Sequence, residues 1–175
     1  MPGIDEKREF VPIGLAVLTV SDTRTEADDT SGHILMERIK DAGHKVVARA
    51  VVRDEKEAVV SQVKAWGDDP AIAAIITTGG TGLTGRDITV EVLRPLFNKE
   101  IDGFSVIFHM VSYESVGLST LQSRACAGVM GETFVFCLPG SNGAVKDGWD
   151  KVISAQLDSR HWPCNLIEII PRLSE

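Results

Sequence analysis

Basic residues are scarce in this chain. Its 175 residues include 18 Lys and Arg against 25 Asp and Glu, which gives a net charge of −7. A basic surface is the electrostatic footprint of nucleic-acid binding, so this balance argues against DNA or RNA as a partner. Cysteines are few as well. Cys126, Cys137 and Cys164 are odd in number and lack metal-finger spacing, so we expect free, buried thiols in a reducing compartment.

Long apolar runs are also absent. No stretch reaches the roughly 18 to 20 apolar residues that span a bilayer, so we expect no membrane partner. Residues 1–9 are polar and lack the apolar core of a signal peptide. These features predict a cytoplasmic protein of a single domain, residues 1–175, in which residues 1–11 are a flexible N-terminal extension.

Several catalytic motifs are missing too. The histidines are scattered and show no HExxH spacing, which argues against a zinc site built from protein ligands. The glycine-rich segment 78–86 lacks the Lys of a P-loop, and Ser141 stands in Pro-Gly-Ser rather than in G-x-S-x-G. A P-loop nucleotide site and a serine-hydrolase site are therefore not supported.

What the chain does have is an alternation of strand and helix patterns. Strands are expected at residues 13–20, 45–52, 71–77, 125–130 and 133–138, the last two forming a hairpin around Gly131. Helices are expected at residues 30–42, with Thr30 or Ser31 as the cap, at 54–66, from 89, at 103–116 and at 144–157. Met110 and the apolar stripe of the helix at 103–116, which includes Ile107, are expected in the core. This alternation predicts an α/β fold, a three-layer α/β/α sandwich with a mostly parallel central sheet.

The most informative segment is the glycine-rich loop that follows the strand at 71–77. Its glycines, at positions 79, 80, 82 and 85, allow positive φ angles, and a simple turn needs fewer such positions. Successive amides of such a loop can cradle an anion at the carboxyl end of a strand, where open α/β sheets bind ligands. We therefore expect a phosphate site here. The second loop, which contains Gly140 and Gly143, favours a plain turn when taken alone.

Two acidic residues stand at the starts of expected helices. Asp87 suits a Mg²⁺ bridge to a substrate phosphate better than a helix cap, because Thr89 offers a better-placed hydroxyl. Asp54 begins an Asp-Glu-Lys-Glu capping box, and the residues alone favour a plain N-cap. Asp22 and Arg24 directly follow the first strand. They could line the rim of the crevice at the strand ends or lie in a solvated loop, and the sequence favours neither.

The remaining polar candidates have ordinary explanations as well. Ser and Asp are common residues at helix starts. This ordinary role accounts for Ser21, Asp29 and Ser31, and Gly32 stands next to them. Arg86, Arg124 and Lys146 are the basic residues nearest the two loops. A surface position is the default for each of them, although an anionic ligand requires some positive partner.

These segments together resemble the molybdenum-cofactor biosynthesis proteins MoaB and MogA. The matching motifs are LTVSDTR at 18–24, DDTSG at 28–32, TGGTG at 78–82, RDIT at 86–89, SRACAG at 123–128 and LPGS at 138–141. The resemblance extends from about residue 12 to residue 165. Segments 121–124 and 160–165 look more like MoaB than MogA.

The resemblance implies a single α/β/α domain that binds molybdopterin. Active members of the family adenylylate the pterin phosphate with Mg-ATP and release pyrophosphate. Residues 78–82 would then receive the terminal phosphate, and Asp87 and Asp54 would be the two essential acids, with Mg²⁺ as their metal. This replaces the plain-cap interpretation of Asp54. The implied substrate-binding residues are Ser21, Asp22, Ser31, Gly32, Thr78, Gly79, Gly80, Thr81, Gly82, Arg86, Pro139, Gly140 and Ser141.

The resemblance also leaves alternatives. Active members commonly have Thr-Pro-Glu after the Arg-Asp pair, whereas this chain has Thr89-Val90-Glu91, and we expect only a small effect on stability. A non-catalytic molybdopterin carrier is the main alternative, and a hydrolase of nucleotide diphosphates is a weaker one. The resemblance also implies a homotrimer, or a hexamer of two trimers. The aromatic residues of segments 103–123 and 160–165 lead us to expect both segments at the subunit interface.

Overall fold

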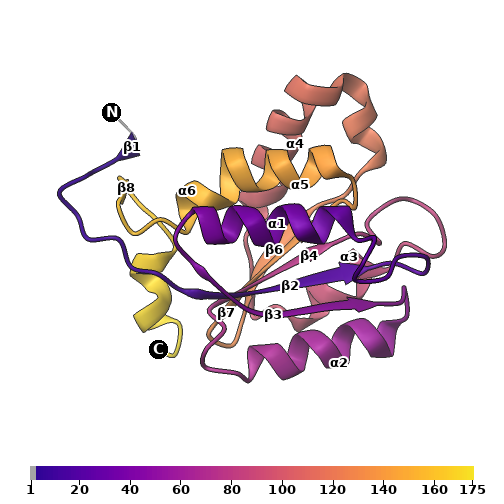
Figure 1. Cartoon of the computed structure of the whole chain (residues 1–175), viewed down its shortest axis with the longest axis horizontal. Coiled ribbons are helices and arrows are strands. Elements are labelled where there is room, and N and C mark those ends of the chain that lie inside the picture. The colour runs from indigo at the N-terminus through magenta and orange to yellow at the C-terminus, as the bar shows by residue number, and fades with distance from the viewer. Residues whose placement is uncertain (1–2) are drawn as a thin grey trace.

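A six-stranded sheet forms the centre of the computed structural model, which describes residues 3–175 (Figure 1). Its strands, in spatial order, are β3 (Lys45–Val52), β2 (Gly14–Val20), β4 (Ala74–Thr78), β7 (Thr133–Leu138), β6 (Cys126–Met130) and β5 (Lys99–Glu100). The pairs formed by β3, β2, β4 and β7 are all parallel. β6 is antiparallel to both β7 and β5, and the predicted hairpin around Gly131 is thereby confirmed.

Helices cover both faces of the sheet. One face carries α1 (Thr30–Asp41), α4 (Asp102–Val116) and α5 (Asn142–Gly148), which continues through the π-helical η3 (Trp149–Ile153) into α6 (Ser154–Gln156). The other face carries α2 (Lys56–Gly67) and α3 (Thr89–Leu93). Short 3₁₀ segments follow at η1 (Arg94–Leu96), η2 (Gly117–Gln122) and η4 (Ile167–Arg172). The predicted three-layer α/β/α sandwich is confirmed.

The inner strands are buried on both faces, which explains their continuous apolar sequences. In β4, Ile76 belongs to the core beneath α1, α4 and α5, whereas its neighbour Ile75 belongs to the core against α2 and α3. Alternate side chains of a strand point to opposite faces, so one strand contributes to two cores. β4 begins at Ala74 rather than at the predicted residue 71, because residues 71–73 still belong to the turn that enters it.

The start of α2 corrects the first interpretation of Asp54. The cap position is Glu55, the helix begins at Lys56, and no side chain caps it. Asp54 therefore lies outside the helix, and its interpretation as a plain N-cap is wrong. The prediction for α1 is also wrong by one residue, because the capping carboxylate belongs to Asp29 rather than to the hydroxyls of Thr30 or Ser31.

The N-terminal segment of the described chain pairs with a segment near the C-terminus. β1 (Gly3–Ile4) pairs antiparallel with β8 (His161–Trp162), and Ser159 Oγ donates a hydrogen bond to the Glu9 carbonyl oxygen at 2.8 Å. Residues 3–11 thus lie against the C-terminal segment. The predicted flexibility of residues 1–11 concerns motion and stays a prediction, and residues 1–2 lie outside the described part.

Some residues expected in the core lie at the surface. Cys126 and Cys137 are buried, but Cys164 is exposed because it follows β8 on the outside of the molecule. Ile107 and Met110 are also exposed, since they lie on the outer side of α4, away from the sheet. Within residues 3–175, no helix combines the length and apolar character needed to cross a membrane.

Candidate functional site

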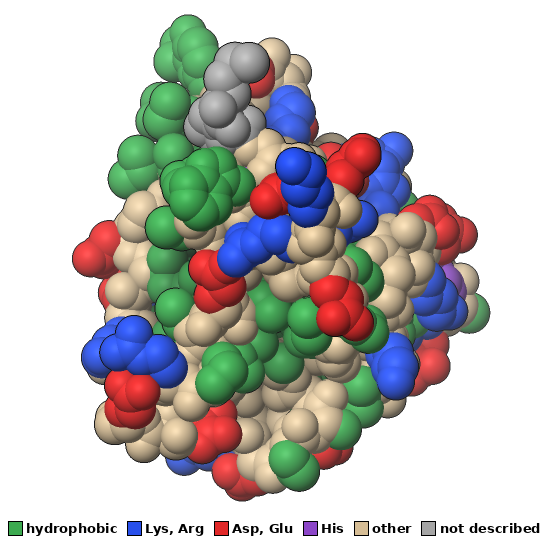
Figure 2. All heavy atoms as spheres, turned by 90° about the vertical axis from the view of Figure 1, so that its left-hand side faces the viewer, with side chains coloured by type: hydrophobic (Ala, Val, Ile, Leu, Met, Phe, Trp, Pro, Cys, Tyr) green, Lys and Arg blue, Asp and Glu red, His purple; other side chains and the backbone are tan. Residues whose placement is uncertain are grey.

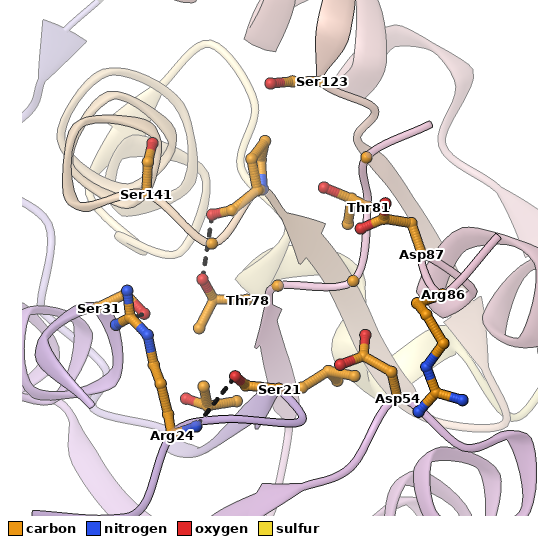
Figure 3. Close-up of a pocket in the computed structure, with 17 residues that line it drawn as sticks. Ser21, Arg24, Ser31, Asp54, Thr78, Thr81, Arg86, Asp87, Ser123 and Ser141 are labelled. Carbon is orange, nitrogen blue, oxygen red and sulfur yellow. Dashed lines mark hydrogen bonds between the residues drawn. The ribbon is translucent and has the colours of Figure 1, made fainter. Parts of the chain in front are cut away.

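A hollow of about 440 Å³ opens where β2, β4 and β7 end (Figure 3). Parallel strands present their carboxyl ends at one edge of a sheet, so the loops that follow them converge. The lining residues are Thr19, Val20, Ser21, Arg24, Ser31, Asp54, Thr78, Gly79, Gly80, Thr81, Gly82, Arg86, Asp87, Ser123, Pro139, Gly140 and Ser141. Both acids and both glycine-rich loops are therefore brought together. Two of the predicted site residues, Asp22 and Gly32, do not line the hollow.

The backbone of the first loop depends on two glycines. Gly79 and Gly80 have φ angles of +96° and +63°. A Cβ on Gly79 would lie 2.2 Å from the carbonyl oxygen of Val20, and one on Gly80 would lie 2.3 Å from Thr89 Oγ1. Both positions therefore require glycine for conformation and for space. The loop can approach strand β2 closely only because these side chains are missing.

The other two glycines of this loop have different environments. Gly82 has no positive φ, but a Cβ there would lie 2.8 Å from a carboxylate oxygen of Asp87. Gly85 has no positive φ, and no neighbouring atom lies within 4 Å of a Cβ built on it. The prediction that all four glycines serve positive φ angles is therefore wrong for Gly82 and Gly85.

The two loops are fastened to each other. Thr78 Oγ1 donates a hydrogen bond to the Pro139 carbonyl oxygen at 3.1 Å. A Cβ on Gly140 would lie 3.1 Å from the Cα of Gly79, so the second loop also needs its glycine for close approach. Ser141 Oγ accepts a hydrogen bond from the amide of Ala144 and caps α5. The floor of the hollow is thus held by backbone contacts.

Asp87 is held as an ionised carboxylate at the edge of this loop. It accepts the hydroxyl of Thr84 at 2.6 Å and the amide of Thr84 at 2.9 Å, and these hydrogen bonds hold its pKa below the usual range. Arg124 stabilises the same loop through hydrogen bonds to its backbone. It donates to the carbonyl oxygens of Thr81 (3.1 Å) and Asp87 (3.2 Å) and pairs with Glu91.

Asp54 lies in a different environment. Its carboxylate is half-buried, and its own amide donates to Asp22 at 3.2 Å. Burial raises the pKa of Asp54, and the nearby charges of Asp22 and Asp87 raise it further, while the charge of Arg86 and the backbone amide of Asp22 oppose the rise only in part. A carboxylate in a cleft whose pKa is raised in this way marks a candidate functional position.

Asp22 stands outside the hollow and holds Arg86. The two side chains make three contacts: Arg86 Nε to Oδ2 at 2.9 Å, and Nη2 to Oδ1 at 2.8 Å and to Oδ2 at 2.7 Å. This bidentate pair connects the loop after β2 with the loop after β4. Arg86 lines the hollow, but its charge is already offset.

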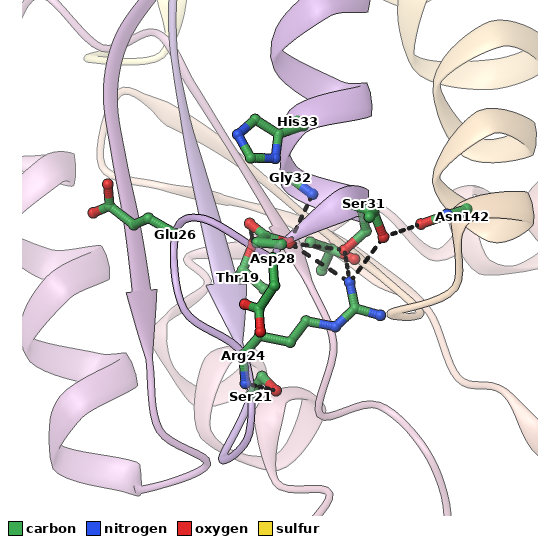
Figure 4. A network of polar contacts seen from close by, with 12 residues as sticks. Thr19, Ser21, Arg24, Glu26, Asp28, Ser31, Gly32, His33 and Asn142 are labelled. Atoms are coloured by element: carbon green, nitrogen blue, oxygen red, sulfur yellow. Dashed lines mark hydrogen bonds and ion pairs between the residues drawn. The ribbon is translucent and has the colours of Figure 1, made fainter.

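Figure 4 shows the polar contacts at the start of α1, around Ser31 and Gly32. Asp29, which is fully buried, organises them. Its carboxylate accepts Thr19 Oγ1 at 2.6 Å, the Gly32 amide at 2.9 Å and Arg49 Nη2 at 3.0 Å. Burial alone would raise the pKa of Asp29, but these hydrogen bonds outweigh it and the pKa is lowered. A Cβ on Gly32 would lie 2.0 Å from this carboxylate, which explains why glycine stands beside the hollow without lining it.

Three lining residues were not predicted from the sequence: Thr19, Val20 and Ser123. Thr19 and Val20 end strand β2, and their position before the polar loop was the signal available for them. Ser123 follows η2, and the positions of α4 and η2 in the fold bring it to the hollow. No local sequence pattern predicts that placement. Arg24, considered only as a rim candidate, does line the hollow.

The donor set at the hollow is made of oxygen atoms. Carboxylates of Asp54 and Asp87 are hard ligands of the kind that Mg²⁺ prefers. In the described range 3–175, no group of three or more His, Cys, Asp or Glu side chains is arranged to hold a metal ion. Two carboxylates can still share a Mg²⁺ that takes most of its ligands from phosphate oxygens and water, which is its usual mode of binding.

The fold and the hollow define a class of protein: an α/β sandwich with a small-molecule site at the carboxyl edge of its sheet. The family described as "Probable molybdopterin binding domain" matches residues 16–159. The chain belongs to this family of molybdenum-cofactor biosynthesis proteins, and the predicted resemblance is confirmed.

Relatives and solved structures agree with this assignment. Molybdenum cofactor biosynthesis protein B of Escherichia coli (strain K12) is 48% identical over 157 residues, which cover 90% of this chain and 92% of that protein. The corresponding protein B of Bacillus subtilis (strain 168) is 43% identical over 157 residues, which cover 88% of this chain and 92% of that protein. A crystal structure of a molybdenum cofactor biosynthesis protein B superposes with a TM-score of 0.86 at 39% identity, covering 95% of this chain and 98% of that one.

Proposed function

We propose that this protein binds molybdopterin and adenylylates its phosphate with Mg-ATP, releasing pyrophosphate. One observation carries the proposal: the carboxylates of Asp54 and Asp87 lie in the same hollow as a glycine loop whose backbone is free of side chains. Membership of the molybdopterin-binding family supports the pterin as the substrate. The acids support a nucleotidyl transfer rather than binding alone, because a pure carrier has no need of an uncompensated carboxylate.

The reaction exchanges one phosphoanhydride linkage for another. An oxygen of the pterin phosphate forms a bond to the α-phosphorus of ATP, the bond from that phosphorus to the bridging oxygen breaks, and pyrophosphate leaves. Mg²⁺, when bound, would neutralise charge on the triphosphate. No covalent intermediate on the protein is required.

The residues of the chain supply position and electrostatics. Within residues 78–82, the amides of Gly80 and Thr81 would hold the attacking phosphate, because the Gly79 amide already donates to the Leu138 carbonyl oxygen. The two fastened loops would keep the phosphate in line. Asp87, ionised by the hydrogen bonds of Thr84, would hold one ligand position of the metal. Asp54 would take a second, because burial and the charges of Asp22 and Asp87 raise its pKa and a cation would stabilise its ionised form.

The direct test incubates the protein with molybdopterin, ATP and Mg²⁺. Mass spectrometry should detect adenylyl-molybdopterin, and pyrophosphate should appear in equal amount. The Asp87→Asn variant should lose activity by roughly 10²- to 10³-fold, the scale of a lost electrostatic contact. Glu132→Gln, an exposed change in the β6–β7 turn, is the charge-matched control.

The same experiment decides between the candidate functions. Molybdopterin binding without any adenylylated product would favour the carrier. An Asp87→Asn variant with the wild-type rate would remove the assigned role of that residue.

We further propose that the protein is a homotrimer or a dimer of trimers. The outer side of α4 and η2 exposes a set of apolar side chains: Val106, Ile107, Met110, Tyr113, Val116, Leu118 and Leu121. Figure 2 shows hydrophobic side chains gathered at the top of the molecule, the end at which α4 lies in Figure 1. Large exposed apolar areas mark interaction sites, and closed symmetry is the default for copies of one chain.

A further inference from the structure

Three arginines surround the hollow, and they differ in how many of their N–H groups are already used. Arg86 gives Nε and Nη2 to the carboxylate of Asp22. Arg124 gives Nε to the Thr81 carbonyl oxygen and both terminal nitrogens to Glu91. Each of these two guanidinium groups has a carboxylate partner in direct contact. Arg124 has all three of its nitrogens engaged. Arg86 keeps an Nη1–Nη2 edge, but the carboxylate of Asp22 in direct contact already offsets its charge.

Arg24 is different. Its Nη1 contacts Thr30 Oγ1 at 3.2 Å and Ser31 Oγ at 3.5 Å. Throughout residues 3–175, no protein acceptor contacts its Nε or Nη2. The carboxylate paired with it belongs to Asp29 and lies 3.8 Å from Nη1, and 33% of the Arg24 side chain is exposed. One edge of this guanidinium is therefore unused.

The charge of Asp29 does not neutralise Arg24. Arg49 Nη2 contacts the Asp29 carboxylate at 3.0 Å, closer than Arg24, and Thr19 and Gly32 also donate to it. Arg49 is therefore the closer cation to Asp29. Asp28 also lies near enough to Arg24 for the charge of Arg24 to lower the pKa of Asp28. Neither carboxylate makes a direct hydrogen bond to the Nε or Nη2 of Arg24 among residues 3–175.

The position of Arg24 is fixed although its outer edge is unused. Ser21 Oγ accepts the Arg24 amide at 3.2 Å, which anchors the loop that leaves β2. Thr30 Oγ1 donates to Asn142 Oδ1 at 2.9 Å, so its lone pairs are left to accept from Arg24. Figure 4 shows the Arg24 guanidinium directed toward Ser31 and Asn142. Little ordering of this side chain would be needed on binding.

The hollow is therefore polarised. Figure 3 shows Arg24 beside Ser31 on one side, and Asp54, Asp87 and Arg86 on the other. A ligand that fills it meets a guanidinium and a hydroxyl at one end and carboxylates at the other. This arrangement suits a molecule with an anionic group at the first end and a metal-bound anionic group at the second.

We propose that Arg24 determines specificity by binding a phosphate group of the substrate through its Nε and Nη2 edge, with the Ser31 hydroxyl beside it. Planar guanidinium groups bind phosphate in this bidentate way, which an ammonium group cannot reproduce. The proposal rests on the proposed function for the identity of the two substrates. The phosphate belongs either to molybdopterin or to ATP, and the experiment distinguishes them.

The test compares Arg24→Gln and Arg24→Lys with wild type. Lys40→Gln is the matched control, since it removes one exposed charge at the far end of α1. Calorimetric titrations with molybdopterin and with ATP should show that Arg24→Gln weakens one of the two by about ten- to a hundredfold, the scale of a lost charge-assisted pair. Arg24→Lys should restore only part of the loss, and the control should bind as wild type. Thermal melting confirms that the variants are folded.

Kinetics adds a second readout. The KM for the same substrate should rise in Arg24→Gln, while kcat changes much less. A rise for molybdopterin identifies the pterin phosphate, and a rise for ATP identifies the nucleotide. Dissociation constants of folded Arg24→Gln that match wild type for both ligands overturn the proposal, as does a wild type that binds neither. If wild type binds but forms no adenylylated product, the proposed function fails, and the titrations still decide the role of Arg24.

Discussion

Asp54 and Asp87 are neighbouring carboxyl groups whose pKa values are shifted in opposite directions. Hydrogen bonds from Thr84 lower the pKa of Asp87. Burial raises the pKa of Asp54, and the charge of Asp87 contributes to that rise. One carboxylate is thus stabilised by the protein, and the other is left for a cation to stabilise.

Asp54→Asn should remove activity and leave the protein at least as stable as wild type at pH 7. The folded-state pKa of Asp54 lies above its usual value of 3.8, so the protonated form is favoured in the folded protein. Its contribution to the free energy of unfolding is fully present below that value and is lost as pH rises through the folded-state pKa. Urea unfolding from pH 7 down to pH 4 should show the advantage of the variant shrinking as pH falls. A variant less stable than wild type at pH 7 would contradict this.

Gly80→Ala should destabilise the protein by about 1–3 kcal/mol, the usual cost of a strained backbone position. The φ angle of +63° disfavours a side chain, and the Cβ would lie 2.3 Å from Thr89 Oγ1 and 2.7 Å from an oxygen of Asp54. Gly85→Ala is the control within the same loop, where nothing lies within 4 Å. It should be neutral or stabilising by up to about 1 kcal/mol. Equal urea midpoints for the two variants would refute the assigned role of Gly80.

His44 should make the fold sensitive to mild acid. It is buried, with 6% exposed, beside Phe10 and Trp149, and its Nδ1 accepts the Ile13 amide at 3.3 Å. Burial lowers the pKa of His44, and the charge of Asp158 opposes that effect only in part. The stability that comes from the neutral ring is present above the usual pKa of 6.5 and is lost as pH falls toward the lowered value.

The measurement is the free energy of unfolding between about pH 7.5 and about pH 5.5, roughly one unit on either side of the usual histidine pKa. Wild type should lose stability across this range. His44→Leu should lose less, because it has no ring to protonate. Parallel pH profiles for the two proteins would show that His44 is not the titrating group.

The oligomer should depend on the apolar side of α4 and η2. Light scattering should give a mass near three or six times the 18.9 kDa of the chain. The double change Leu118→Glu and Leu121→Glu should lower that mass, because these two side chains are 72% and 71% exposed in the isolated chain. Val47→Glu, on the edge strand β3, is the control. A monomeric wild type at micromolar concentration would refute the assembly, and an unchanged mass in the double variant would refute only this interface.

Local patterns predicted the fold because they record burial directly. The continuous apolar run of β4 indicated a strand with two buried faces, and the hairpin of β6 and β7 followed from Gly131 between two apolar runs. Helix starts were less predictable. Asp29 and Glu55 took cap positions predicted for neighbouring residues, because the alternatives make tertiary contacts that no local propensity includes.

The sequence by itself determined the α/β sandwich, the glycine loop at the end of β4 and the two acids beside it, since each depends on residues close together in the chain. Only the tertiary structure decided how the site is charged. Arg86 reaches the carboxylate of Asp22 across 64 positions and Arg124 reaches that of Glu91 across 33, whereas among residues 3–175 no carboxylate lies within hydrogen-bond distance of Arg24. Hydrogen-bond saturation is a property of groups brought together by folding, and for that reason no pattern along the chain distinguishes these three arginines.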